Sequence, residues 1–306
     1  MNFTSSHKFN RQPLSVVDDI PVFSIDDIYV DNYRRIAVDH LNAMNPESDN
    51  PFIENELWVE LEQSTRDLIE EYVPAGACVL DVGVGLGRVM GPLGQYRCFG
   101  IDITMEYLRL ARERSIEVAF ARVEDMPYQD SMFDAVVSSD VLEHVTEFDL
   151  SVKQILRVLK PGGHLIIRVP YREDLKVYLQ EGLPYEFIHL RNFDENSIQL
   201  YFEKIHRCKL LQTRLVASYW QGETRLRYRM TPPDVPLRAL LNEGKLTAIG
   251  LDKEGERILR SLISVPEIEM VAWINRIKAD NPTLFKAVQG LLIFEIEMNV
   301  VLRKQP

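Results

Sequence analysis

Cysteine is scarce in this sequence of 306 residues, and its three copies show no spacing typical of metal ligands. Cys78, Cys98 and Cys208 each lie in or beside an apolar, strand-like run. Proteins of reducing compartments rarely contain disulfides. We therefore expect three buried free thiols, and neither a disulfide nor a bound metal.

A surplus of positive charge and long apolar runs are also missing. The 35 Lys and Arg residues are outnumbered by 46 Asp and Glu residues, which gives a formal net charge of −11. Because an extended contact with nucleic acid needs many cations to neutralise phosphates, we expect no nucleic-acid partner. The longest apolar stretches, such as residues 290–294, are too short to cross a bilayer. The first ten residues lack the apolar core of a signal peptide, so we expect a cytoplasmic protein with no membrane partner.

Short apolar runs alternate with helical patterns after Pro74. The predicted strands are 78–82, 98–103, 117–121, 133–138, 164–169, 209–217 and 294–302, and the predicted helices between them include 88–93, 105–114 and 152–159. The turn residues Pro161-Gly162-Gly163 end the last of these helices. Such alternation predicts an α/β fold with a doubly wound, mostly parallel sheet. Ligands of such sheets bind at the carboxyl ends of the strands.

The flanking segments lack this alternation. Residues 1–25 are polar and irregular, and a helical apolar periodicity follows as far as Tyr72. Residues 218–290 lie between the last two predicted strands and contain two further helical patterns, 253–263 and 267–278. We expect a helical N-terminal cap (1–73), a ligand-binding core (74–217 and 291–306) and a helical insertion (218–290) that covers the crevice as a lid.

A glycine-rich turn follows the first predicted strand. Gly83, Gly85 and Gly87 let the backbone approach a ligand closely, because no Cβ stands in the way. Asp102 ends the second predicted strand, where a carboxylate can accept hydrogen bonds from both hydroxyls of a ribose. The turn and the carboxylate together predict a site for a nucleoside.

The spacing of the turn distinguishes between nucleoside cofactors. Dinucleotide enzymes prefer G-x-G-x-x-G, in which a helix amino terminus holds a pyrophosphate. Here the pattern is D-x-G-x-G-x-G, and Asp81 stands two positions before the first glycine. A carboxylate beside the turn disfavours a phosphate and suits a ligand with an amino group and a sulfonium. The pattern therefore favours S-adenosylmethionine over a nicotinamide dinucleotide.

Further motifs follow one another in a familiar order. They are Leu80–Gly87, Gly100–Thr104, Val123–Tyr128, Ser131–Asp134, Val141–Val145 and Leu159–Gly163. On these motifs the chain from Cys78 to Val169 resembles the class I S-adenosylmethionine-dependent methyltransferases, particularly the small-molecule subgroup near the ubiquinone-biosynthesis type. Residues 298–304 resemble that family's antiparallel last strand. The resemblance implies a seven-stranded Rossmann-like sheet and S-adenosylmethionine as cofactor, and it leaves the methyl acceptor open.

The resemblance also implies roles for individual residues. Asp81 and the loop from Gly83 to Gly87 would hold the methionine end, and the end of the fourth strand, Ser138 and Ser139, would offer backbone groups to the methionine amino group. Asp102 would bind the ribose. Ile103 would lie against the adenine, and Val123 and Glu124 would meet the adenine edge. The family commonly has Asp where this sequence has Arg122, so the sequence departs from the family's pattern beside the expected adenine contact.

Three residues are candidates for the chemistry. His144 is a candidate base, because histidine titrates near neutral pH, although family members also use this position to pack against or hydrogen-bond the following helix. His189, in the loop 184–192, and Tyr171, after the fifth strand, are expected at the crevice, although a loop histidine can equally bond a local carbonyl. In the leading helices, Tyr33 and Trp58 either cover the cofactor or belong to the core.

The expected function is methyl transfer to a small molecule, with oxygen favoured as the methylated atom. Arg225, Arg227 and Arg229 alternate with apolar residues, which would place three guanidinium groups on one side of an extended segment. Such groups suit an anionic or sugar-linked acceptor, although they can also be a solvated edge. The alternatives are a protein or RNA methyltransferase, and a non-catalytic S-adenosylmethionine-binding partner or regulatory protein.

Overall fold

The computed structural model describes residues 8–43, 56–173, 175–218 and 295–306, with the short pieces 227–228, 276, 279–282 and 292–293. The chain divides into two compact units. The first consists of Met1–Tyr171, Leu175–Val216 and Glu297–Pro306, and the second of Arg172–Asp174 and Ala217–Ile296. Several predictions for the insertion fall outside the described residues: those for Arg225 and Arg229, for the helix 253–263 and for most of the helix 267–278. The backbone of Arg227 lies in β9 (Arg227–Tyr228), which pairs with β10 (Leu292–Ile293).

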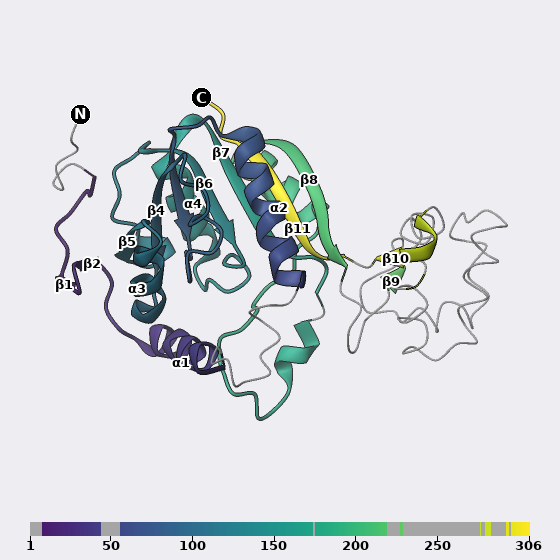
Figure 1. Cartoon of the computed structure of the whole chain (residues 1–306), viewed down its shortest axis with the longest axis horizontal. Coiled ribbons are helices and arrows are strands. Elements are labelled where there is room, and N and C mark those ends of the chain that lie inside the picture. Colours follow the sequence, from purple (N-terminus) through teal and green to yellow (C-terminus); the bar gives the residue numbers. More distant parts are fainter. Residues whose placement is uncertain are drawn as a thin grey trace. The chain divides into compact units, whose positions relative to one another are not determined.

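The first unit is built on one sheet, whose strand order is β1-β2-β5-β4-β3-β6-β7-β11-β8. Its strands are β1 (Ser15–Val17), β2 (Ile20–Val22), β3 (Cys78–Val82), β4 (Arg97–Asp102), β5 (Glu117–Phe120), β6 (Phe133–Ser139), β7 (Leu159–Pro170), β8 (Lys209–Ser218) and β11 (Glu295–Arg303). The neighbours from β5 to β7 pair in parallel, and β11 pairs antiparallel with β7 (Figure 1). The predicted doubly wound, mostly parallel sheet with an antiparallel last strand is thus confirmed.

Helices cover both faces of this sheet. They are α1 (Ile28–Ala43), α2 (Glu56–Tyr72), α3 (Met105–Glu113), α4 (Phe148–Val158) and α5 (Glu195–Gln199), with the short turns η2 (Val123–Asp125), η3 (Leu175–Leu179) and η4 (Leu200–Ile205). Leu68 of α2 and Leu108 of α3 share a core with Val79, Val137 and Ile166 of the strands. Residues next to these in the strands point to the opposite face, where α4 packs. Figure 1 shows α2 in front of β7 and β11.

The N-terminal segment differs from the expectation of an irregular stretch. Residues 15–22 form a hairpin, and Val22 pairs with Phe120, so the hairpin extends the edge of the sheet beside β5. Asp18 and Asp19 form its two-residue turn with φ of 49° and 60°. Aspartate tolerates this left-handed conformation better than most residues, and the primed turns of tight hairpins require it. The polar residues of the turn therefore made the segment resemble an irregular one, although two short strands flank the turn.

Two further local predictions were wrong in detail. Residues 88–93 form turns instead of a helix, because Gly91 and Pro92 interrupt the pattern and proline has no N–H to donate. The helix predicted over 152–159 spans Phe148–Val158, and β7 begins at once with Leu159. The segment Pro161-Gly162-Gly163 is a bulge within β7, and Gly162 has a φ of 76°.

The three cysteines are free thiols. Cys208 is buried as expected, whereas Cys78 and Cys98 are only half-buried. Among the described residues, no helix is both long enough and apolar enough to cross a membrane.

Candidate functional site

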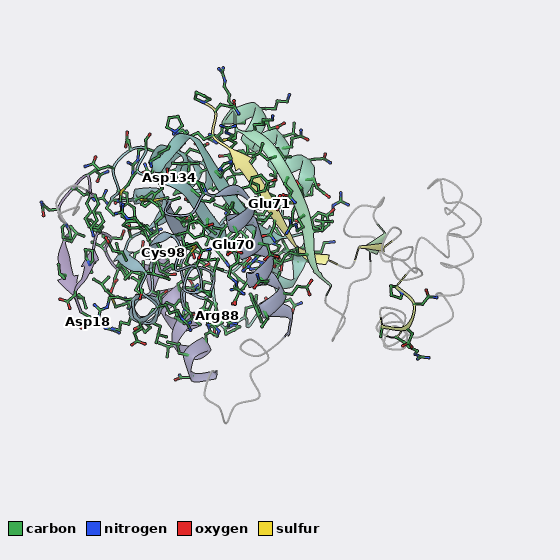
Figure 2. All side chains as sticks on the ribbon, turned by 45° about the horizontal axis from the view of Figure 1, so that its top comes forward. Asp18, Glu70, Glu71, Arg88, Cys98 and Asp134 are labelled. Atoms are coloured by element: carbon green, nitrogen blue, oxygen red, sulfur yellow. The ribbon has the colours of Figure 1, made fainter. Side chains whose placement is uncertain are left out.

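A cavity of about 710 Å³ opens at the carboxyl ends of β3 and β6, within the first unit. Its described lining comes from α1, α2 and α3, from the end of β3 and the glycine turn that follows, from the ends of β6 and β7, and from the loops after β6 and before α5. The residues are Ile36, Asp39, His40, Trp58, Glu62, Asp81, Gly83, Val84, Gly85, Leu86, Arg88, Val89, Tyr107, Ser139, His144, Arg168 and Tyr185. Figure 2 shows Arg88 toward the end of the sheet near α1, whereas Asp134, at the start of β6, lies toward the other end. The cavity therefore lies where the topology predicts a ligand site.

The glycine turn has a backbone that only glycine adopts readily. Gly83, Gly85 and Gly87 have φ values of 72°, 49° and 70°. A Cβ built on Gly83 would stand 2.3 Å from Cγ2 of Val141, which leaves no room for a side chain. At Gly85 the nearest atom to such a Cβ is 4.0 Å away, so only the conformation demands glycine there. The turn thus lines the cavity with backbone.

Asp102 connects this turn to the end of β4. Its Oδ2 accepts a hydrogen bond of 2.9 Å from the backbone N–H of Gly85, and its Oδ1 accepts one of 2.9 Å from that of Thr104. Burial raises the pKa of the carboxyl to about 6, although these donors oppose the rise. Each oxygen has a second lone pair for a ligand hydroxyl. Asp102 is not among the described residues that line the cavity.

Asp81 lies at the end of β3 and lines the same cavity. The residue is 2% exposed, and its Oδ1 has no hydrogen-bond partner among the described residues. Burial raises the pKa of its carboxyl well above the usual range, and Arg168 only partly opposes this. Ser139 also lines the cavity, and its buried hydroxyl likewise has no hydrogen-bond partner among the described residues. A buried carboxylate without a donor is costly, so a ligand ammonium group fits this position well.

Arg168 is a cavity residue that sequence analysis missed. Its Nη2 stands 2.5 Å from Oδ2 of Asp140 and its Nε 3.1 Å from Oδ1, and its Nη1 donates to the hydroxyl of Thr65 at 3.1 Å. Arg168 is 4% exposed, and its ion pairs raise its pKa further above the usual range. The signal in the sequence is a lone charge inside the apolar run Leu165–Val169. Such a residue in a central strand needs a buried partner.

The fold brings two of the three predicted catalytic residues together. The rings of His144 and His189 are 4.7 Å apart at their centroids, and His144 lines the cavity. Nδ1 of His144 lies 3.2 Å from the carbonyl oxygen of Ile188, so this nitrogen has a partner in the loop before α5. Tyr171 is 6% exposed, donates its hydroxyl to the Glu195 carboxylate at 2.9 Å, and is not among the described lining residues.

The residues predicted for the adenine are buried or paired. Val123 opens η2 and is buried, and Ile103 packs against the core. Glu124 accepts a hydrogen bond of 2.5 Å from Nε of Arg122. Nη1 of Arg122 also stands 2.5 Å from the carboxylate of Asp27. The arginine that replaces the family's usual Asp therefore joins Glu124 to the segment before α1.

The two aromatic residues of the leading helices have different surroundings. Trp58 lines the cavity. Tyr33 packs against the ring of His144 with a centroid distance of 5.6 Å, and burial raises the pKa of its hydroxyl far above the usual range. Both residues lie at the site, on the side formed by α1 and α2.

Comparison with known proteins agrees with this geometry. Residues 80–167 match the family described as Methyltransferase domain. The chain is 32% identical over 149 residues to an uncharacterised protein of Methanocaldococcus jannaschii, a match that covers 48% of this chain and 70% of that protein. It is 36% identical over 110 residues to the ubiquinone/menaquinone biosynthesis C-methyltransferase of Pseudomonas putida, covering 31% of this chain and 42% of that enzyme. It is also 30% identical over 102 residues to the tRNA (carboxymethyluridine(34)-5-O)-methyltransferase of Arabidopsis thaliana, covering 32% of this chain and 25% of that enzyme.

Solved structures share the fold at low sequence identity. An S-adenosylmethionine-dependent methyltransferase of Thermotoga maritima superposes with a TM-score of 0.50 and 14% identity, over 90% of this chain and 99% of that one. A chain from the Haloferax volcanii complex between the Trm112 methyltransferase activator and a methyltransferase gives 0.52 and 15%, over 92% of this chain and 100% of that one. The family match of residues 80–167 and the Methanocaldococcus jannaschii relative, together with the glycine turn and the sheet order, show that the chain belongs to the class I S-adenosylmethionine-dependent methyltransferases.

Proposed function

We propose that the protein transfers the methyl group of S-adenosylmethionine to an oxygen atom of a small-molecule acceptor bound in the 710 Å³ cavity. The observation that carries this proposal is His144, which lines the same cavity as Asp81 and stands beside His189. A hydroxyl acceptor must lose a proton to become a good nucleophile, whereas an amine needs only to be uncharged. Imidazole groups at the cavity wall therefore favour an oxygen acceptor.

The methionine end of the cofactor is proposed to lie at the glycine turn. There the Asp81 carboxylate would accept hydrogen bonds from the ligand ammonium, with Ser139 nearby. Asp102 would accept hydrogen bonds from the ribose, and Ile103, Val123 and Glu124 would border the adenine. The sulfonium methyl is already activated, so the protein must mainly align the acceptor with the sulfur–methyl bond and exclude water.

A small acceptor agrees with the size and walls of the cavity. Its volume lies in the range of pockets that hold small ligands. Its lining carries carboxylates, such as Asp39, as well as guanidinium groups, such as Arg88, so it is not the strongly basic surface that a polyphosphate chain such as RNA requires.

RNA methylation is the second candidate, because one relative is named as a tRNA methyltransferase. The two candidates separate in an assay of S-adenosylhomocysteine release with hydroxylated small acids, sugar-linked acids and total tRNA as acceptors. The proposal expects turnover with a small molecule and a strong loss of kcat in His144→Gln. Turnover with tRNA alone would contradict it, and cofactor binding without any turnover would favour a non-catalytic partner protein.

A further inference from the structure

A buried carboxylate and two imidazoles meet beside the cavity. One ligating atom from each of Glu143, His144 and His189 lies within 4.8 Å of the other two. Glu143 is 0% exposed, and its Oε1 stands 3.8 Å from Nε2 of His144. Two imidazoles and one carboxylate are a common set of protein ligands for divalent transition metals.

The second nitrogen of each imidazole has a partner that orients the ring. Nδ1 of His144 lies 3.2 Å from the carbonyl oxygen of Ile188, and Nδ1 of His189 lies 3.2 Å from the hydroxyl of Tyr178. A carbonyl can only accept, so His144 carries its proton on Nδ1 and keeps the lone pair on Nε2. Metal-bound histidines typically make such a bond with the nitrogen that does not bind the ion. In this arrangement Nε2 is the ligand atom.

The backbone beneath the cluster is fixed from both sides. The N–H of Leu190 donates to the carbonyl of Glu143 at 2.8 Å, and Arg191 donates to the carbonyls of Leu142 and Val145 at 2.7 and 2.5 Å. These bonds hold the loop that carries His189 against the loop that carries Glu143 and His144.

A second anchor comes from α1. Its buried residue Asn32 donates to the carbonyl of Phe187 at 3.0 Å and accepts from the N–H of Glu186 at 2.9 Å. The His189 loop is thus attached to α1 as well as to the Glu143 loop. A preorganised cluster of this kind is what a metal site requires.

We propose that Glu143, His144 and His189 bind one divalent transition-metal ion at the wall of the cavity. Ligands about 2.1 Å from a tetrahedral ion stand about 3.4 Å apart, so side-chain rotations that bring these atoms inward by about an ångström complete the site. Two nitrogens among three ligands favour zinc, iron or manganese over magnesium and calcium, which prefer oxygen. Three protein ligands leave a coordination position open toward the cavity that His144 lines.

The open position gives the ion a role in catalysis, and this part rests on the proposed function. An acceptor hydroxyl bound there loses its proton to solvent at neutral pH, because the cation stabilises the resulting oxyanion. The oxygen then forms a bond to the methyl carbon while the carbon–sulfur bond breaks, and that electron pair remains on sulfur. The sulfonium becomes a neutral thioether. The imidazoles therefore act as ligands, and the ion activates the hydroxyl.

Cobalt(II) is a direct probe of the site, because its visible absorption becomes intense when nitrogen and oxygen ligands hold it with low coordination number. The full-length protein, treated with a chelator, is titrated with cobalt(II) and then with zinc. We expect a stoichiometric absorption change that zinc reverses and excess magnesium does not. The same titration of His189→Ala and Glu143→Gln should lose the change. An unchanged spectrum in the wild type, or an equal signal in both variants, would overturn the proposal.

Two controls separate metal binding from folding and from the proposed function. His164→Gln removes a histidine from β7 away from the described cavity lining, so its cobalt spectrum should equal that of the wild type. Each variant is also titrated with S-adenosylhomocysteine by calorimetry, which should give wild-type affinity. If His189→Ala lost both signals through a folding defect, Glu143→Gln would decide: a wild-type cobalt spectrum in a Glu143→Gln protein that binds S-adenosylhomocysteine would overturn the assignment of ligands. Cobalt binding without S-adenosylhomocysteine binding in the wild type would overturn the proposed function and leave the metal site intact.

Discussion

Asp81 and Asp102 stand at the ends of neighbouring strands, yet their surroundings differ. Asp102 already accepts hydrogen bonds from the N–H groups of Gly85 and Thr104. Asp81 has an oxygen without any hydrogen-bond donor among the described residues, and its burial is nearly complete. Burial raises the pKa of both carboxyls. In the proposed complex, the Asp102 carboxylate is thus positioned before the cofactor arrives, whereas the Asp81 carboxylate gains a hydrogen-bond donor from the cofactor.

This contrast makes Asp81 the residue with the largest predicted effect on cofactor affinity. Asp81→Asn removes a charge-assisted hydrogen bond to the ligand ammonium, which is worth about 1.5–3 kcal/mol, or roughly a tenfold to hundredfold loss of affinity. The same substitution removes a buried carboxylate whose ionised form disfavours folding, so the melting temperature of the free protein should rise at pH 7. Calorimetric titration with S-adenosylhomocysteine and thermal melts measure the two effects. A variant that loses stability and keeps its affinity would reverse the comparison.

Asp102→Asn is predicted to have a smaller effect, about a tenfold loss of affinity, because the amide still accepts one hydrogen bond of the type that the carboxylate accepts. Its melting temperature should change little, because the loss of one acceptor oxygen for Gly85 and Thr104 is offset by the removal of a buried charge. If Asp102→Asn weakened binding more than Asp81→Asn, the ribose and not the ammonium would dominate recognition.

The pH dependence of binding should identify Asp102. Its folded-state pKa is about 6, so about one tenth of the free protein is ionised there at pH 5 and nearly all at pH 7.5. Ribose hydroxyls bind the ionised form, so affinity should fall by up to about tenfold as pH drops from 7.5 to 5. Because folding raises this pKa from 3.8 to about 6, ionisation of Asp102 also costs stability as pH rises from about 4 to about 6. In Asp102→Asn the component of the profile near pH 6 should disappear.

Ser139→Ala should have the smallest effect, a loss of affinity of about threefold, because a neutral hydroxyl contributes about 0.5–1 kcal/mol to a hydrogen bond with a ligand. Its hydroxyl is buried without a partner among the described residues, so stability of the free protein should rise slightly. A loss of affinity as large as that of Asp81→Asn would move the ammonium toward Ser139.

Much of the fold could be predicted because its determinants are local. The alternation of apolar runs and helical periods predicted β3 to β7, and the turn glycines marked the cofactor loop. The hairpin of residues 15–22 escaped prediction because its strands have three residues each and because β2 pairs with β5, which is distant in the sequence. The turns at 88–93 escaped because Gly91 and Pro92 overrode an otherwise helical pattern.

Parts of the candidate site could be predicted from residue types and their spacing in the sequence. Asp81, Asp102 and the glycines could be singled out from spacing, and His144 from its motif. Arg168 and the meeting of Glu143 with His189 depend on contacts between separate strands and loops, so no spacing reveals them. The expectation of no metal came from cysteines, whereas the cluster proposed here is built from a glutamate and two histidines that only the fold brings together.

The most direct test of the account is a crystal structure of the full-length protein with S-adenosylhomocysteine. The account predicts that the ligand amino group lies within hydrogen-bond distance of Asp81, that its ribose hydroxyls reach Asp102, and that its sulfur faces the part of the cavity lined by His144. A ligand bound outside this cavity, or an Asp81 carboxylate still without a donor in the complex, would contradict it.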